Sequence, residues 1–207
     1  MAEIVYVLTN EAMEGLVKIG RTSTSVEQRI RELDNTSVPL PFQCFYAGEV
    51  KDSAFVESRL HQAFISSRVR SNREFFRIDP NQVKAAIQIA DPIDVTPRVD
   101  VVVDASDVQA LKKAAANEER RSRLRFTDLG IPVGAVLTFT KDPAYTCEVV
   151  ADGKVRYESE ILSPAAAALR VIHALGYEWS SISGSDYWMF EEETLTSRRL
   201  RLEDERE

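Results

Sequence analysis

The first ninety residues alternate between short runs of strand-forming residues and segments with helical spacing, and this alternation constrains the fold more than any other feature. Residues 4–9 (IVYVLT) are rich in β-branched and aromatic residues, and after a polar turn residues 16–20 form a second such run. The two runs predict a β-hairpin. Thr24 and Glu27 then form a capping-box pattern ahead of apolar residues at helical spacing, which predicts a helix over residues 25–35.

The alternation continues to residue 90. Residues 42–50 again have strand composition, apolar residues recur at helical spacing over 53–67, and residues 74–78 form another strand-like run. Pro80 is typical of the first turn of a helix. These segments predict an α/β (α+β) domain over residues 1–90, with a three-stranded sheet and flanking helices.

The remainder of the chain divides into a linker, a second small domain and a short tail. Residues 91–125 contain two prolines and then an alanine-rich, heavily charged stretch, from about residue 106, which predicts a helical linker. From residue 126 the pattern returns to short strands, and Ser163-Pro164 is typical of a helix start. We therefore expect a small antiparallel sheet with a helix over residues 126–200, followed by a charged tail at 201–207.

Composition favours a soluble protein with packed cores. Of the 207 residues 44% are apolar, and no apolar run reaches the roughly 18 residues of a membrane span. The sequence opens on a strand-like segment without a basic leader, so we expect a cytoplasmic protein with no membrane partner. Cys44 and Cys147 lie in apolar strand-like segments, which favours buried reduced thiols over a disulfide or a zinc site.

Charge is distributed unevenly along the chain. The formal net charge is −7, and residues 127–207 hold 8 basic and 15 acidic residues, so the C-terminal part carries the negative excess. Between residues 57 and 77, in contrast, five arginines stand beside only Glu57 and Glu74. These arginines are Arg59, Arg68, Arg70, Arg73 and Arg77. Such a local cationic patch is typical of a phosphate-binding surface, whereas the net charge argues against a protein that coats nucleic acid by charge alone.

Several residues of the first domain have the order and spacing of a known nuclease motif. Tyr6 ends the run Ile4-Val5-Tyr6, Lys18-Ile19-Gly20 follows on the second strand, and Arg29 lies nine residues after Gly20. Glu57-x-x-x-His61 and Glu74-Phe75-Phe76 come later in the chain. In this order the residues resemble the GIY-YIG nuclease superfamily, in particular its phage and bacterial branch with KIGRT at the second motif. The resemblance covers residues 3–90.

The resemblance implies roles for these residues in phosphodiester hydrolysis. Tyr6 is the candidate general base, and because a phenol has an ordinary pKa of about 10, it needs help from a cation such as Lys18 or from a metal-bound water. Arg29 is the candidate phosphate ligand, since its planar guanidinium is always charged. Glu57 is the candidate ligand of Mg²⁺ or another divalent cation such as Mn²⁺. His61, one helical turn later, is a candidate proton relay or hydrogen-bond donor to a phosphate.

Further residues are candidates for substrate binding. They are Arg21 in the KIGRT segment, Arg68, Arg70 and Arg73 in the cationic patch, and Glu74. The late polar residue of the superfamily, usually an amide, has no clear match, and Glu74 and Asn72 are the candidates for it.

Simpler interpretations of the same residues remain open at this point. Tyr6 can be a core residue with a satisfied hydroxyl, and Lys18 a solvated cation. Glu57 and His61 can be an exposed pair on one helix face, and Arg29 can cover the edge of the core with its stem.

The C-terminal domain holds a second group of candidate residues. Residues 129–135 (LGIPVGA), 163–167 (SPAAA) and the strand that includes Gly184-x-x-Tyr187-Trp188 resemble the small RAMA domains that accompany restriction enzymes and adenine methylases. This resemblance implies a DNA reader in which Trp179, Tyr187 and Trp188 stack on or enclose a modified base. The alternative is that these aromatic residues form the core of the small sheet.

These features predict a metal-dependent DNA endonuclease with a C-terminal reader of modified DNA, as in modification-dependent restriction or phage defence. One site of this type cuts one strand, so a double-strand break requires a homodimer or two visits. Two other classes remain open. They are a catalytically inactive DNA-binding module and a protein-interaction subunit of a defence complex.

Overall fold

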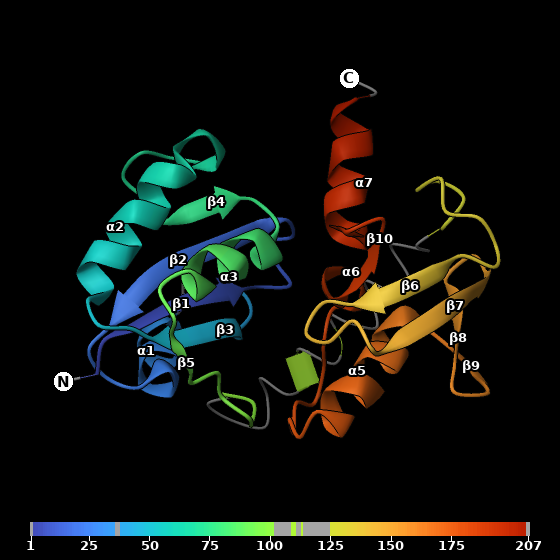
Figure 1. The fold of residues 1–207 in the computed structure, drawn as a ribbon, viewed down its shortest axis with the longest axis horizontal. Helices are drawn as coiled ribbons and strands as arrows, with labels where there is room; N and C mark the ends of the chain where they lie inside the picture. The colour runs from blue at the N-terminus through green and yellow to red at the C-terminus, as the bar shows by residue number, and fades with distance from the viewer. Residues whose placement is uncertain (1, 36–37, 102–108, 111–112, 114–124, 206–207) are drawn as a thin grey trace. The chain divides into compact units, whose positions relative to one another are not determined.

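The structure is a computed structural model that describes residues 2–35, 38–101, 109–110, 113 and 125–205 (Figure 1). The chain divides into two compact units, Met1–Val108 and Gln109–Glu207. The linker helix predicted within residues 91–125 lies, from residue 106 on, almost entirely outside the described residues. Within the described part of the chain, no helix combines the length and the apolar character that crossing a membrane requires.

The first unit is built on a five-stranded antiparallel sheet with the order β4-β2-β1-β3-β5. Its strands are β1 (Ile4–Thr9), β2 (Leu16–Thr22), β3 (Gln43–Glu49), β4 (Phe75–Arg77) and β5 (Ile93–Asp94). The predicted hairpin is the central β1–β2 pair, which places Tyr6 opposite Gly20. The sheet is wider than the three strands predicted, because β4, which lies within the strand-like run at residues 74–78, pairs with one edge and the two-residue strand β5 pairs with the other.

Three helices cover the two faces of this sheet. They are α1 (Val26–Leu33), α2 (Ser53–Ala63) and α3 (Pro80–Gln88), and a 3₁₀ helix, η1 (Ile65–Ser67), follows α2. The face that carries Tyr6 packs against α1 through Val26 and Ile30. The opposite face, which carries Ile19, is covered by α2 and α3. The sheet is therefore buried on both sides, as its apolar strands require.

The start of α1 differs from the predicted capping box by one residue. Ser25 is the N-cap, and its hydroxyl accepts a hydrogen bond from the Gln28 amide at 3.1 Å. Thr24 lies outside the helix, where its hydroxyl and that of Thr22 are 2.9 Å apart. The loop after β2 thus keeps its own hydrogen bonds before the helix begins.

The second unit has a six-stranded antiparallel sheet with the order β11-β10-β6-β7-β8-β9. Its strands are β6 (Val136–Phe139), β7 (Thr146–Ala151), β8 (Lys154–Tyr157), β9 (Glu160–Leu162), β10 (Trp188–Phe190) and β11 (Glu193–Thr194). The helices are α5 (Pro164–Ala174), α6 (Gly184–Tyr187) and α7 (Leu195–Asp204). The predicted sheet with a helix is confirmed, and Ser163 caps α5 as expected. Cys44 and Cys147 are both buried free thiols.

The predicted charged tail at 201–207 is wrong in part, because helix α7 continues to Asp204. Leu195 is fully buried, and Arg198 donates a hydrogen bond to the Leu129 carbonyl at 2.7 Å. Arg201 pairs with Glu193 at 2.9 Å. Both arginines contact residues outside α7. The alternating charges, which in the sequence suggest a solvated tail, therefore help to hold this helix against the rest of the unit.

Candidate active site

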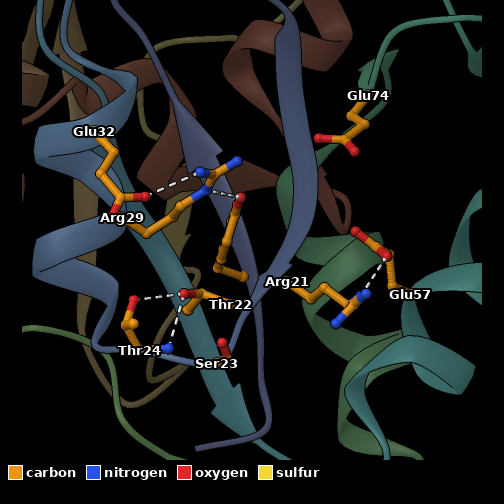
Figure 2. Close-up of a pocket in the computed structure, with 9 residues that line it drawn as sticks. Arg21, Thr22, Ser23, Thr24, Arg29, Glu32, Glu57 and Glu74 are labelled. Atoms are coloured by element: carbon orange, nitrogen blue, oxygen red, sulfur yellow. Dashed lines mark hydrogen bonds and ion pairs between the residues drawn. The ribbon is translucent and has the colours of Figure 1, made fainter.

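Half of the predicted site residues of the first unit line one open cleft of about 490 Å³ (Figure 2). Strands β1 and β2, the loop after β2, helices α1 and α2, and the residue before β4 each contribute to its lining. The lining residues are Tyr6, Arg21, Thr22, Ser23, Thr24, Arg29, Glu32, Glu57 and Glu74. Five of the predicted site residues therefore lie in a single cleft, although their positions span almost seventy residues of sequence.

Tyr6 is buried but points its hydroxyl into this cleft. The residue is 1% exposed on β1, and Gly20 stands opposite it on β2. A Cβ atom at position 20 would lie 2.5 Å from the Tyr6 hydroxyl oxygen. The phenol can therefore lie across β2 only because residue 20 is glycine.

Arg29 fixes the Tyr6 hydroxyl from α1. Its Nε donates a hydrogen bond to the hydroxyl oxygen at 3.3 Å, and its Nη1 donates to Glu32 Oε2 at 3.1 Å (Figure 2). Burial raises the pKa of Tyr6 above its ordinary value, and the hydrogen bond and charge of Arg29 offset only part of this rise. Tyr6 is thus a neutral phenol at neutral pH, beside a cation that favours its ionised form.

Glu57 reaches the cleft from α2 and is paired with Arg21 of β2. Arg21 Nε donates to Glu57 Oε2 at 3.2 Å (Figure 2). The Glu57 side chain is 18% exposed, whereas that of Arg21 is 46% exposed. The carboxylate is therefore held at the cleft wall by a cation that faces solvent.

Lys18 lies beside Glu74 and outside the cleft lining. It is buried, forms an ion pair with Glu74, and places its ammonium 5.5 Å from the Phe75 ring centre. Burial raises the pKa of Glu74, but the hydrogen bond and charge of Lys18 outweigh it, so that pKa is lowered overall. No hydrogen bond joins Lys18 to Tyr6, whose described cationic partner is Arg29. Lys18 therefore keeps Glu74 ionised and directed at the cleft.

His61 does not line the cleft. Its Nε2 donates a hydrogen bond to the Ile19 carbonyl at 3.0 Å, and its ring packs 5.1 Å from the Phe76 ring. Because a carbonyl only accepts, the nitrogen that faces it carries the proton in this arrangement. His61 thus ties α2 to β2, and the predicted proton-relay role has no support in these contacts.

Three of the four arginines predicted to bind substrate, Arg68, Arg70 and Arg73, also lie outside the cleft lining, and their contacts differ. Arg68 Nε donates to the Arg73 carbonyl at 2.6 Å, and its guanidinium stacks 5.6 Å from the Phe76 ring centre. Arg70 and Arg73 are exposed. Arg68 is therefore engaged within the fold, whereas the other two face solvent.

The cleft residues fit a divalent cation that is shared with a substrate. Within the described residues no group of three or more His, Cys, Asp or Glu side chains could hold a metal alone. Mg²⁺, however, commonly takes one or two protein carboxylates together with phosphate and water oxygens. Glu57 and Glu74 are two such carboxylates at one cleft, which is the donor set that this mode of binding needs.

Four lining residues, Thr22, Ser23, Thr24 and Glu32, were not among the predicted site residues. The first three form a polar run that starts at the last residue of β2, and Glu32 lies three residues after Arg29 on the same helix. Both signals are visible in the sequence. The close approach of Gly20 to Tyr6 is not, because it depends on strand register.

Trp188, predicted to stack on a base, is a core residue of the second unit. Its side chain is fully buried, its Nε1 donates to the Pro164 carbonyl at 2.9 Å, and its ring lies 5.1 Å from that of Phe139. A ring without an exposed face cannot stack on a nucleobase in this conformation. The predicted base contact of Trp188 is therefore corrected to a structural role.

The same correction applies to Trp179 and Tyr187. They are 8% and 4% exposed, and their rings meet edge to face at 6.2 Å. Lys141 places its ammonium 5.3 Å from the Trp179 ring centre. These aromatic residues form one cluster around β6 and β10, which is the core interpretation that the sequence left open.

Comparison with known proteins bears on the first unit only. No curated protein and no solved structure matches the chain. Residues 3–91 match the family model of the T5orf172 domain, which is a nuclease-like domain family. The match covers less than half of the chain, and it contains every residue of the cleft lining. The cleft therefore lies wholly in the part of the chain that matches a nuclease-like domain.

Proposed function

We propose that the first unit is a divalent-cation-dependent DNA endonuclease domain of the GIY-YIG type, which hydrolyses a phosphodiester bond in the cleft. The observation that carries the proposal is the convergence of Tyr6, Arg29 and Glu57 on one open, polar cleft. The match of the same residues to a nuclease-like domain family supports it, and the name of that family is consistent with a phage-associated role.

In this proposal Arg29 binds the scissile phosphate. Its Nε and Nη1 are already held by Tyr6 and Glu32, so the planar group is oriented before substrate arrives. The guanidinium can then donate to phosphate oxygens and stabilise the negative charge that develops in the transition state. Lysine cannot replace this geometry, since it offers a single ammonium rather than a planar fork.

Tyr6 is the proposed acceptor of the proton from the attacking water. The phenol must first lose its own proton, which burial disfavours and the neighbouring guanidinium favours. Activity that depends on Tyr6 should therefore increase with pH. Gly20 contributes by leaving room for the hydroxyl at this position.

Glu57 and Glu74 are the residues that would hold Mg²⁺ or Mn²⁺. When bound there, the cation supplies positive charge at the phosphate and lowers the pKa of water. Arg21 is paired with Glu57 and nearly half exposed, so its side chain can turn from the carboxylate to a phosphate oxygen. Lys18 keeps the second carboxylate ionised.

Nicking of supercoiled plasmid DNA by the full chain tests this proposal. We expect conversion to open circles with Mg²⁺ or Mn²⁺ and none with EDTA. Glu57→Gln should abolish the reaction, whereas Glu49→Gln, which removes the charge of an exposed carboxylate at the end of β3, should not. Full activity of Glu57→Gln would remove it from the metal site, and a wild-type chain that cuts with neither ion would overturn the proposal.

We also propose that the second unit directs the cleft to particular DNA, as a RAMA-like reader of modified bases in restriction or phage defence. The sequence resemblance and the separate compact fold support this role. Since the aromatic cluster is buried, recognition would use other side chains or an opened conformation. Cleavage rates on matched duplexes with unmodified adenine and cytosine, N6-methyladenine, 5-methylcytosine or 5-hydroxymethylcytosine test it. Equal rates on all four would leave the unit without a reader function.

A catalytically inactive DNA-binding module is the second candidate. It is favoured by the ion pairing of all three cleft carboxylates, which are Glu32, Glu57 and Glu74. It is also favoured by Lys18, because the nuclease superfamily that this segment resembles usually has a tyrosine, a possible proton acceptor, at this position. A wild-type chain that binds DNA tightly with Mg²⁺ but leaves plasmid intact would select this candidate.

A further inference from the structure

A short hairpin beside the cleft presents two exposed arginines. The Val69 amide donates to the Phe75 carbonyl at 2.9 Å, and Arg68 pairs with Phe76 as an isolated antiparallel bridge. The Arg73 amide donates to the Arg70 carbonyl at 3.0 Å, which closes the hairpin with a four-residue turn. We call residues 70–73 the arginine turn. Main-chain hydrogen bonds within the turn and between the two arms of the hairpin hold its backbone.

Arg68 braces the arginine turn and is not itself presented to a ligand. Its Nε donates to the Arg73 carbonyl at 2.6 Å, and its guanidinium lies over Phe76, which is fully buried. The contacts join the two arms of the hairpin and attach it to the core under α2. A cation with these two contacts contributes to the conformation of the turn.

Arg70 and Arg73 differ from the cations in and beside the cleft because they have no carboxylate partner among the described residues. Arg21, Arg29 and Lys18 are each paired with a glutamate. Arg70 and Arg73 are exposed and form no ion pair with any residue that the structure describes. Their charge is therefore available to an external anion.

The position of the turn relates it to the cleft. Arg73 directly precedes Glu74, which lines the cleft, and the Ile19 amide donates to the Glu74 carbonyl at 3.1 Å. The turn is thus fixed where the hairpin meets β2. The cleft lining itself holds two arginines and three glutamates, so it is not cationic by composition. Attraction of a polyanion to this region must come from charges outside the cleft.

We propose that the arginine turn is a docking surface for the sugar–phosphate backbone of duplex DNA, on a stretch that flanks the scissile phosphate. The link to a scissile phosphate rests on the proposed function, whereas the docking itself does not. The turn supplies affinity that is independent of base sequence, because it contacts phosphates, and it takes no part in the bond-breaking step. Arg70 and Arg73 contact the phosphates, and Arg68 holds the turn in place.

The salt dependence of binding tests this proposal. Binding of the full chain to a short fluorescein-labelled duplex is followed by anisotropy in EDTA, so that no DNA is cut, over a range of salt concentrations. The slope of log affinity against log salt is negative, and each lost phosphate contact makes it shallower by about 0.9. For Arg70→Gln/Arg73→Gln we expect a slope that is shallower by about 1.8. The affinity lost between about 50 and 200 mM salt should then be about tenfold less than in the wild type.

Arg31→Gln/Lys51→Gln is the matched control, because it removes the same charge from two exposed cations of the first unit outside the turn. It should keep the wild-type slope. An unchanged slope in the Arg70→Gln/Arg73→Gln variant, or an equal change in the control variant, would overturn the docking surface. So would a wild-type chain whose affinity does not depend on salt.

The outcome is separable from that of the proposed function. If the wild type never cuts plasmid but the Arg70→Gln/Arg73→Gln variant alone has the shallower slope, the docking surface stands and the nuclease proposal fails. If the wild type cuts and both variants have its slope, the nuclease proposal stands and the docking surface fails.

Discussion

The cleft of the first unit and the aromatic core of the second each contain a buried aromatic residue with one polar atom, yet the two polar atoms have different surroundings. The Tyr6 hydroxyl accepts a hydrogen bond from a charged side chain and borders an open cleft. The Trp188 indole N–H donates to a main-chain carbonyl inside the core. Burial of the ring therefore does not distinguish a candidate site from a core. The two are distinguished by the hydrogen-bond partner of the polar atom and by whether that atom borders an open cleft.

This difference predicts that substitutions in the two regions have opposite consequences. Changes at the cleft should alter activity more than stability, since most of its side chains are polar and partly exposed. Changes in the aromatic core should alter the stability of the second unit first. The following predictions test that division, in order of decreasing effect.

Trp188→Ala should lower the free energy of unfolding of the second unit by about 3 to 5 kcal/mol, because it removes a fully buried ring and leaves a cavity. Both tryptophans of the chain lie in this unit, so the fluorescence of Trp179 still reports its unfolding in urea. Trp188→Phe keeps a six-membered aromatic ring but removes the five-membered ring and its hydrogen bond to Pro164, and it should cost less. Unchanged stability together with a lost preference for modified DNA would make Trp188 a base-stacking residue after all.

Arg29→Ala should reduce single-turnover cleavage about 100- to 1000-fold, the usual cost of a lost transition-state charge contact. Its effect on unfolding should be small, because the side chain is 34% exposed. Arg29→Lys should restore little of the rate, whereas Arg31→Ala, an exposed arginine of the same helix, serves as the control. Complete rescue by lysine would rule out a contact that depends on the planar fork.

Gly20→Ala should lower both the cleavage rate and the stability of the first unit, because a methyl group at this position would lie 2.5 Å from the Tyr6 hydroxyl. Accommodating it moves the phenol away from Arg29 and costs about 1 to 3 kcal/mol of stability. Tyr6→Phe removes only the nearest of the crowded atoms, because the ring carbons Cζ and Cε2 would still lie 2.7 and 2.8 Å from the added methyl, so it relieves part of the clash. The two substitutions should therefore be non-additive in urea unfolding, with the double variant more stable than the sum of the single effects. Additive effects would mean that the two residues do not interact.

The pH profile of cleavage tests Tyr6 itself. Its pKa is raised by burial, so at neutral pH the phenolate is a minor form whose population rises about tenfold per pH unit. The wild-type rate should rise with pH above neutrality, and Tyr6→Phe should remove that rise. The same raised pKa favours the protonated folded state, so this contribution to stability is complete below the ordinary pKa and is lost as pH rises through the folded one. A profile that is identical in Tyr6→Phe would assign the base to another group.

The β1–β2 hairpin, α1, α2, α3 and α5 could be predicted from sequence because their signals are local: strand composition, helical spacing and capping residues. Strands β5 and β11 could not, since each has only two residues and exists through pairing with a distant partner. Helix α7 was missed for a similar reason. The carboxylates that hold Arg198 and Arg201 include residues that precede the helix.

The candidate site shows the same limit. The order of Tyr6, Arg29 and Glu57 indicates a common site, and these residues do line one cleft. The four-residue spacing of Glu57 and His61 predicts that they share one helix face. Only Glu57 reaches the cleft, however, and His61 contacts the Ile19 carbonyl. Arg68 and Arg70 are indistinguishable in the sequence. Their roles differ because one meets a buried ring and a carbonyl and the other meets solvent.

The smallest predicted effects come from two matched helix caps, one in each unit. The Ser25 hydroxyl accepts from the Gln28 amide at 3.1 Å at the start of α1, and the Ser163 hydroxyl accepts from the Ala166 amide at 3.2 Å at the start of α5. Replacing either serine by alanine should cost about 1 kcal/mol of stability in its own unit. Only Ser25→Ala should also slow cleavage, because α1 carries Arg29 and a frayed first turn loosens its contact with Tyr6. Urea unfolding and single-turnover rates of both variants make the comparison. Equal rates in the two variants, at equal losses of stability, would show that the position of Arg29 does not depend on the cap and is set by its contacts with Tyr6 and Glu32.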